Sequence, residues 1–355
     1  MVPPALNESD DSRFATVFRE AFGPGPASFA QFMELALYHP KCGYYRRERP
    51  RVGFMPRADF YTASSTGTVF GELVAAAAAH LLSPGRPDNH AFVEIGAEPG
   101  GGVLAGVAHP FRELRTLRLG DELLLAGDSV VFSNELFDAQ PFHRLVRRAG
   151  EWRELGVAVV NATGLHGAHG CTGQQPVNDR PGQLIEVELP ALSPPVSAIL
   201  NRLPSDAEEG YRLDLPLAAE ALCARLAQPG WNGLFVAFDY GKTWSALTGD
   251  TPAGTARAYR LHRQERDLLA NPGRQDLTCH ICWDWMSAAL TAAGWRDVRL
   301  ESQESFLLRH AGPAAERIAR SAPPGPDPRR SRLQELLHPG LLGQRFQVLH
   351  ARRSG

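Results

Sequence analysis

The chain has almost no lysine. Of its 37 basic residues only Lys41 and Lys242 are lysines, and arginine supplies the rest. We interpret this shortage as codon bias rather than as a functional signal. The formal net charge is −2, and no Lys/Arg block stands out that would gather nucleic acid. We therefore expect no nucleic-acid partner.

Long apolar runs are lacking too. The alanine-rich stretch GELVAAAAAHLL (71–82) is too short to cross a bilayer and ends at Ser83-Pro84. The opening MVPPALNESDD has neither the basic nor the apolar region of a secretory signal, and it is too acidic for a typical transit peptide. These features predict a cytoplasmic protein without a membrane partner.

Cysteine is scarce: the five residues are odd in number and scattered, as is typical of reduced thiols in a cytoplasm. Cys279 and Cys282 form a C-x-x-C, but the second pair that a zinc site of this kind needs is absent from the sequence. A redox motif would open a helix after a strand in a small thioredoxin-like unit. We interpret the two cysteines as helix-facing bystanders and expect no metal.

What the chain does contain is an alternation of apolar β-type runs and helical patterns. With 355 residues, 43% of them apolar, it has the composition of an ordinary globular protein. Such alternation favours an α/β fold with a mainly parallel, doubly wound sheet. The expected strands lie within 91–102, 129–132, 183–189 and 233–241, with late strands within 295–310 and 345–353, and helices are expected within 213–227 and 281–295.

A helix is also predicted near the N-terminus. Ser28 and Gln31 have the spacing of a capping box, apolar residues then recur at helical intervals, and Pro40 closes the segment. This pattern indicates a helical addition that packs on a larger core.

Polar residues follow three of the predicted strands, and ligands of open α/β sheets collect at the carboxyl ends of strands. The first case is V-E-I-G-A-E-P-G-G-G, where glycines let backbone N–H groups approach a ligand. Glu94 lies inside this strand and would be costly to bury without a partner. A glycine-rich turn alone is weak evidence, so a simple turn remains an alternative.

The second strand runs into a polar cluster. Asn134, Glu135 and Asp138 follow the apolar run 129–132 directly. Helix capping by Ser133 or Asn134 would explain one of these residues but not the cluster. We therefore place a reaction cleft at this strand end.

The third strand is followed by Asp239-Tyr240-Gly241. Asp239 could equally satisfy a turn, so this motif leaves both interpretations open.

Taken together, these segments resemble the MidA-type family of S-adenosylmethionine-dependent methyltransferases. These are bacterial relatives of the mitochondrial arginine methyltransferase that assists complex I assembly. NELFDAQP and YHPKCGYY are the specific parts of the match, which extends in family order from about residue 28 to the end. The matching pieces are FMELALYHPKCGYY, ADFYTASSTGTVFGEL, VEIGAEPGGG, FSNELFDAQPFHRL, FVAFDYG, QDLTCHICW, ESQESFLLRHAG and GLLGQRFQVL.

The resemblance implies a Rossmann-like class I methyltransferase sheet of seven strands, with a helical N-terminal addition and an inserted excursion. It implies an N-terminal helical region with an active-site loop over 1–85. A Rossmann-like core over 86–310 would carry insertions near 146–182 and 242–278, and a Pro-rich connector with a final helix and strand would fill 311–355.

The resemblance also assigns roles to single residues. S-adenosylmethionine would be the methyl donor, and no metal would be required. The donor-binding residues would be Asp59, Thr62, Glu94, Gly96 and Gly100. On the acceptor side, the catalytic residues would be Asn134, Glu135, Asp138 and Asp239.

Asp121 completes the donor set by its spacing. It follows RTLRL and lies about 20 residues after the glycines, the usual distance to the acidic residue that binds a ribose.

Methyl transfer is an in-line displacement at a sulfonium, so positioning of donor and acceptor matters most. A guanidinium presents a fork of N–H donors that carboxylates can hold, and one carboxylate can accept the departing proton. We therefore expect arginine methylation of a protein substrate. Homodimer formation is left open.

Three features depart from the family pattern. Glu98 and Pro99 replace the central part of the usual G-x-G-x-G loop, the segment between Gly96 and Asn134 is short, and Cys282 replaces an acidic residue. These departures define a competing hypothesis: a degenerate methyltransferase fold that has lost donor binding and acts as an assembly or interaction factor.

Overall fold

The computed structural model describes residues 10–47, 67–97, 101–160, 182–321 and 327–354. The chain forms two compact units of interleaved segments. Unit 1 comprises Met1–Arg49, Ala139–Ala218 and Ser245–His280, and unit 2 comprises Pro50–Asp138, Ala219–Trp244 and Ile281–Gly355. The domain ranges given above stay a prediction.

Unit 1 is built on an antiparallel sheet in the order β1-β6-β5-β8. The strand β7 pairs with the C-terminal half of β6, from Leu155 to Val159. The strands β12-β11-β13 form a smaller sheet. The elements are α1 (Asp10–Phe22), β1 (Ala27–Ser28), α2 (Phe29–Tyr38), η1 (Tyr44–Arg46), β5 (His143–Arg148), β6 (Glu151–Val159), β7 (Leu184–Glu188), α4 (Pro194–Ser197), η4 (Leu200–Arg202), β8 (Arg212–Leu215), β11 (Arg257–Arg260), β12 (Arg263–Glu265) and β13 (Asp276–Thr278), with most of α6 (Trp244–Gly249).

The helix α2 begins as its sequence predicts. Ser28 Oγ accepts the Gln31 N–H at 3.2 Å, and Gln31 Oε1 accepts the Ser28 N–H at 2.9 Å. The capping box is therefore confirmed. The helix ends at Tyr38, before Pro40.

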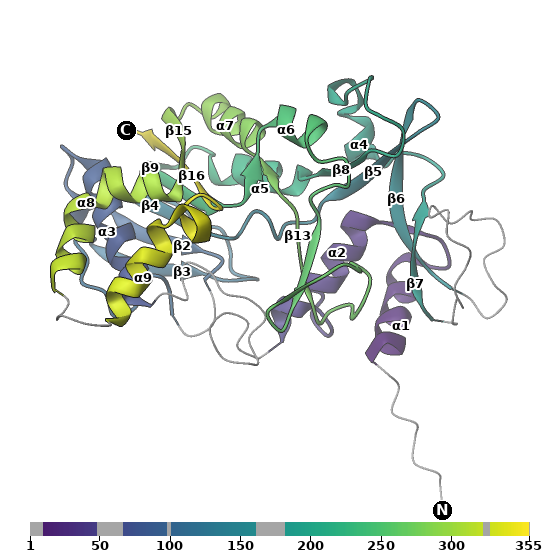
Figure 1. Ribbon diagram of the computed structural model, residues 1–355, viewed down its shortest axis with the longest axis horizontal. Helices are drawn as coiled ribbons and strands as arrows, with labels where there is room; N and C mark the ends of the chain where they lie inside the picture. The colour runs from purple at the N-terminus through teal and green to yellow at the C-terminus, as the bar shows by residue number, and fades with distance from the viewer. Residues whose placement is uncertain (1–9, 48–66, 98–100, 161–181, 322–326, 355) are drawn as a thin grey trace, which may run out of the picture. The chain divides into compact units, whose positions relative to one another are not determined.

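Unit 2 contains a six-stranded sheet in the order β15-β16-β9-β4-β2-β3 (Figure 1). The strands β3, β2, β4 and β9 are parallel, and β16 and β15 are antiparallel to their neighbours. The elements are α3 (Thr68–Leu82), η3 (Pro87–Asn89), β2 (Ala91–Ile95), β3 (Glu113–Leu117), β4 (Gly127–Asn134), α5 (Leu217–Leu226), β9 (Trp231–Asp239), β10 (Gly241–Lys242), β14 (Ile281–Cys282), α7 (Trp283–Ala292), β15 (Arg296–Ser302), α8 (Gln303–Ser321), α9 (Pro328–Leu337), η5 (Pro339–Gly343) and β16 (Gln347–Arg353).

Alternate side chains of the central strands face two separate cores. Val130 and Phe132 of β4 pack with the helices α3, α8 and α9, whereas Val131 packs on the other face with α5 and α7. Figure 1 shows the helices α3, α8 and α9 together on one side of the sheet. Burial on both faces explains why the strands read as continuous apolar runs.

Four sequence-based predictions are corrected by the structure. The methyltransferase sheet was expected to have seven strands, but in the described part of unit 2 it has six. The short turn 118–126 joins β3 directly to β4 and leaves no room for a further strand and helix between them. The strand within 183–189 belongs to unit 1, where it pairs with β6. The segment 295–310 is a strand only as far as Ser302, after which α8 begins.

The fourth correction concerns the C-x-x-C motif. Cys279 and Cys282 are both buried, and neither lies on a helix. Burial raises the pKa of the Cys282 thiol to about 12, which keeps it protonated. A protonated, buried thiol of this kind is unreactive and contributes to packing.

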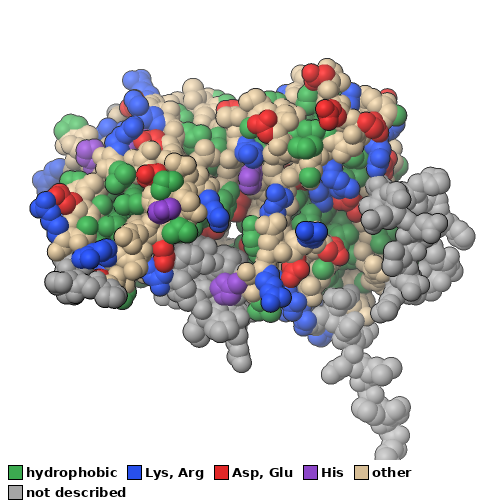
Figure 2. Space-filling model, in the orientation of Figure 1, with side chains coloured by type: hydrophobic (Ala, Val, Ile, Leu, Met, Phe, Trp, Pro, Cys, Tyr) green, Lys and Arg blue, Asp and Glu red, His purple; other side chains and the backbone are tan. Residues whose placement is uncertain are grey.

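On the face of the molecule that Figure 2 shows, basic and acidic side chains of the described residues are interspersed. In the described part of the chain, no helix combines the length and the apolar character needed to cross a membrane.

Candidate methyl-donor and acceptor site

The polar strand ends named above lie at one edge of the sheet in unit 2. The strands β2, β4 and β9 are parallel neighbours, and Ile95 is level with Ser133 while Asn134 is level with Phe238. The chain therefore leaves β2 at Gly96, β4 at Glu135 and β9 at Tyr240 along the same carboxyl edge. The structure thus brings together segments that are far apart in the sequence.

The turn after β2 is shaped by glycine. Gly96 has a φ of 80°, in the left-handed region that glycine adopts readily, and its N–H donates to Leu117 O at 2.8 Å. A Cβ at this position would press on Leu136 Cδ1, 2.9 Å away. Glycine is therefore required here both for the backbone conformation and for the packing of Leu136, in a turn of the kind that binds an anionic or nucleotide ligand in related folds.

Glu94 lies beneath this turn. Its side chain is buried, and Oε2 accepts the Val103 N–H at 2.5 Å. Burial raises the pKa of Glu94 to about 7, although the hydrogen bond from Val103 lowers it. A Cβ on Gly102 would overlap this carboxylate, so both Gly96 and Gly102 are needed in the turn as it stands.

Asp121 lies in the turn after β3 and is exposed to solvent. Its Oδ2 accepts the Arg118 N–H at 2.8 Å, and its own N–H donates to Arg118 O at 3.0 Å. The side chain thus closes its own turn beside the carboxyl end of β3.

Glu135 adopts a backbone conformation that is unusual for a residue with a side chain. Its φ is 51°, and its N–H donates to Phe238 O at 2.9 Å, which ties it to the end of β9. Non-glycine residues held at positive φ cluster at functional sites because the fold must compensate for their strain. The strain indicates that the direction of this side chain is constrained.

The carboxylate of Glu135 is half-buried, and two of its polar neighbours are described residues. Oε1 accepts the Asn134 amide Nδ2–H at 3.0 Å, and Oε2 lies 3.5 Å from the Tyr240 hydroxyl, which can donate to it. The other amide atom, Asn134 Oδ1, is buried without a hydrogen-bond partner in the structure. Buried acceptors are rarely left unpaired, so this oxygen retains unused acceptor capacity.

Asp239 is completely buried. Oδ2 accepts the Phe137 N–H and Oδ1 the Tyr240 N–H, each at 2.8 Å. Burial raises the pKa of Asp239 to about 7, although the backbone N–H groups of Leu136, Phe137, Asp138 and Tyr240 lower it. The side chain therefore fixes the turn that carries Glu135 and does not itself face solvent.

Asp138 is also buried, with 4% of its surface exposed, at the end of the same turn. Asn134, Glu135, Asp138 and Asp239 thus form one cluster, in which Glu135 is the most accessible of the three carboxylates. Asp59, Thr62, Glu98, Pro99 and Gly100 lie outside the described residues.

Two aromatic side chains near the cluster were not predicted as site residues. Tyr240 reaches Glu135 and packs on Phe346 with ring centroids 4.1 Å apart. Trp283 lies so close to Gly241 that a Cβ there would overlap the indole ring, whose Nε1–H donates to Gln347 Oε1 at 2.5 Å. The D-Y-G motif therefore needs its glycine for packing, and the adjacent tyrosine was the available signal for the site.

A parallel sheet with a glycine turn after its first strand, bordered by antiparallel strands, is the class I methyltransferase fold. A family model for S-adenosyl-L-methionine-dependent methyltransferases matches residues 113–300, more than half of the chain. The chain belongs to this family, and the resemblance found in the sequence is confirmed.

Comparisons with individual proteins agree with this family, since the similar proteins are also methyltransferases. The chain is 24% identical over 383 residues to the "Protein arginine methyltransferase NDUFAF7 homolog, mitochondrial" of Drosophila melanogaster, covering 92% of this chain and 81% of the relative. The Xenopus tropicalis protein arginine methyltransferase NDUFAF7 is 23% identical over 320 residues, with 74% and 67% covered.

Among solved structures, a Burkholderia thailandensis protein bound to S-adenosyl-homocysteine superposes with a TM-score of 0.79 at 23% identity, covering 98% of this chain and 94% of that one. A second crystal structure from that organism gives a TM-score of 0.77. These likenesses show the fold.

The described residues fit a methyl donor of this kind. Gly96 gives the turn after β2 a left-handed backbone without a side chain, and Glu94 beside it is a buried carboxylate with a single backbone donor. When bound, S-adenosylmethionine supplies an electrophilic methyl group on a sulfonium.

Proposed function

We propose that this protein transfers a methyl group from S-adenosylmethionine to a guanidinium nitrogen of an arginine in a protein substrate. The observation that carries the proposal is the strained, half-buried Glu135 at the end of β4, with the Asn134 amide and the Tyr240 hydroxyl beside it. The protein arginine methyltransferases among the relatives support it.

In this proposal Glu135 accepts N–H bonds from the guanidinium and draws its positive charge away from the nitrogen that reacts. Charge-assisted bonds between a carboxylate and a guanidinium are directional, so they orient the acceptor as well as bind it. Asn134 Oδ1 accepts a further N–H. A new N–CH₃ bond forms as the S–CH₃ bond breaks, and the nitrogen releases one proton to a carboxylate of the cluster.

The other residues of the cluster have supporting roles. Asp239 is a positioning residue, because its carboxylate holds the backbone of the turn after Glu135. Asp138 lies at the end of that turn. Glu94, Gly96, Gly100 and Asp121, with Asp59 and Thr62, form the donor side of the proposed site.

Calorimetry with S-adenosylmethionine and S-adenosylhomocysteine tests the donor side. We expect both to bind at a one-to-one ratio, because the buried Glu94 and the glycine turn after β2 fit a single donor molecule. Absence of binding to folded protein would favour the degenerate-fold alternative, in which the chain acts as an assembly or interaction factor.

Substitution of Glu135 tests the acceptor side. Glu135→Gln should keep donor affinity within about threefold and lower methyl transfer to arginine about 100-fold or more, because the amide cannot accept the proton. Asp138→Ala should likewise retain donor binding and lose transfer. The measurements are calorimetry and mass spectrometry of methylarginine in a protein substrate.

Glu208→Gln, at an exposed position, is the matched control and should leave both quantities unchanged. Full transfer by both Glu135→Gln and Asp138→Ala would remove the catalytic assignment. The cytoplasmic location remains a prediction, as does the absence of nucleic-acid and membrane partners.

A further inference from the structure

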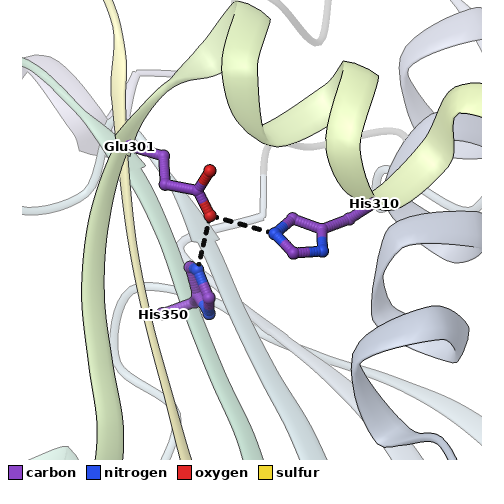
Figure 3. Close-up of side chains that lie close together, drawn as sticks. All are labelled: Glu301, His310 and His350. Atoms are coloured by element: carbon purple, nitrogen blue, oxygen red, sulfur yellow. Dashed lines mark hydrogen bonds and ion pairs between the residues drawn. The ribbon is translucent and has the colours of Figure 1, made fainter.

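Three side chains that commonly bind metals and are not part of the proposed methyl-transfer site converge from β15, β16 and α8 of unit 2. Glu301 Oε1 lies 2.9 Å from His310 Nε2 and 3.0 Å from His350 Nε2 (Figure 3). All three potential ligand atoms lie within 4.8 Å of one another. The glutamate thus points between the two imidazole rings, as Figure 3 shows.

The fold explains this convergence. On the antiparallel strands β15 and β16, Glu301 is level with Val348, so His350 is its diagonal neighbour on the same face. The helix α8 crosses that face and contributes His310, while Phe306 packs against both imidazole rings. Glu301 is nine residues from His310 and 49 from His350, spacings that form no recognisable motif.

The cluster is well shielded from solvent. The side chains of Glu301, His310 and His350 are 7%, 10% and 3% exposed. The second carboxylate oxygen, Glu301 Oε2, lies 3.1 Å from Arg309 Nη1 but makes no hydrogen bond of good geometry, and His310 Nδ1 has no hydrogen-bond partner. A trio built only for hydrogen bonding would be expected to satisfy such buried atoms.

We propose that Glu301, His310 and His350 bind a Zn²⁺ ion. Two imidazole nitrogens and one carboxylate oxygen are a common donor set for zinc. Zinc–ligand bonds of about 2.0–2.2 Å in tetrahedral geometry place the ligands roughly 3.3–3.5 Å apart, so the two distances from Glu301 to the histidine nitrogens need to widen by only a few tenths of an ångström. Each Nε2 proton gives way to the metal, and the imidazole carries its proton on Nδ1 instead.

The remaining coordination position is open to water or to a fourth side chain. His80 on α3 lies beside the cluster, with its ring centroid 5.5 Å from that of His310, and it is exposed to solvent. A bound ion would tie α8 to the edge strands β15 and β16. The proposed role is therefore structural.

Metal titration tests this site. The full-length protein is stripped with EDTA, and ZnCl₂ and CoCl₂ are added separately. We expect one equivalent of Zn²⁺ to bind and to raise the melting temperature, because an ion that binds only the folded state stabilises it. Co²⁺ in the same site should show visible absorption typical of four-coordinate nitrogen and oxygen ligands.

Two variants separate metal binding from hydrogen bonding. Glu301→Gln keeps the one acceptor oxygen that both histidines share but loses the charge, and His310→Ala removes one of the three ligands. Each should weaken Zn²⁺ affinity at least tenfold, whereas His262→Ala, at an exposed position in unit 1, should not change it. His80→Ala should alter the Co²⁺ spectrum if this residue supplies the fourth ligand.

No Zn²⁺ binding by the stripped wild-type protein would overturn the proposal. Affinity that is unchanged in both Glu301→Gln and His310→Ala would also overturn it, because the ion would then bind elsewhere. Circular dichroism of the metal-free variants verifies that each is folded.

Discussion

Two buried carboxylates in unit 2, on the strands that flank β4, make an instructive comparison. Glu94 on β2 and Asp239 on β9 are both shielded from solvent, and burial raises the pKa of each to about 7. Their hydrogen bonding differs. Glu94 accepts one backbone N–H, from Val103, whereas Asp239 accepts from a whole turn.

The difference in hydrogen bonding distinguishes Asp239, which positions the backbone, from Glu94, which can still bind a ligand. Asp239 uses its bonding capacity on the protein itself, and the turn that places Glu135 depends on it. Glu94 retains most of its acceptor capacity beside a glycine turn. A raised pKa alone therefore does not distinguish a positioning residue from one that meets a ligand.

The largest effect is expected at Asp239. Asp239→Ala leaves several buried N–H donors without an acceptor, so the free energy of unfolding should fall by about 3–5 kcal/mol. Denaturant unfolding followed by circular dichroism measures it. Asp239→Asn, which retains one acceptor oxygen, should lose less.

Asp128→Ala is the matched control, since this aspartate is exposed near the start of β4. It should change stability by less than about 0.5 kcal/mol. A loss below about 1 kcal/mol in Asp239→Ala would mean that the turn does not depend on this carboxylate.

A smaller effect, with the opposite sign, is expected at Glu94. The folded protein holds the Glu94 proton up to about pH 7, whereas the unfolded chain releases it near its ordinary value of 4.5. Stability that this group contributes is therefore fully present below pH 4.5 and is lost as the pH rises through 7. Glu94→Gln removes that loss and should be more stable than wild type by about 1–3 kcal/mol at about pH 8.

The measurement is the free energy of unfolding at several pH values, with Glu113→Gln as an exposed control on β3. The advantage of Glu94→Gln should vanish near pH 4.5. A difference that is constant from about pH 4.5 to about pH 8 would contradict the assignment of burial as the cause.

The smallest effect on stability is expected at Tyr240. Its hydroxyl lies at the long distance of 3.5 Å from Glu135 Oε2, so Tyr240→Phe should change the free energy of unfolding by about 0.5 kcal/mol or less. Methyl transfer should fall several-fold with donor affinity unchanged, because Glu135 loses an orienting partner. Unaltered transfer would remove Tyr240 from the site.

Local signals in the sequence predicted part of this arrangement. The capping box at Ser28 and the apolar runs before Glu135 and Asp239 identified a helix start and two strand ends, because caps and buried strands depend on residues close in the chain. The mainly parallel sheet was predicted from the alternation of strand and helix patterns along the chain. The position of QLIEVEL was not, since its apolar pattern fits either of two sheets.

Other features depended on the packing of distant segments. The local pattern around Asp239 is the same whether its carboxylate faces solvent or the backbone of Phe137, 102 residues away. The cluster of Glu301, His310 and His350 likewise arises only when β15, β16 and α8 pack together.

The amino-acid sequence by itself determined the periodicity of strands and helices, the helix cap at Ser28 and the family of the chain, because these reside in neighbouring residues and short motifs. Tertiary structure decided which carboxylates are buried, which are bonded to backbone and which remain accessible. Desolvation and hydrogen bonding depend on how closely packed segments exclude water, and that is a property of the folded chain.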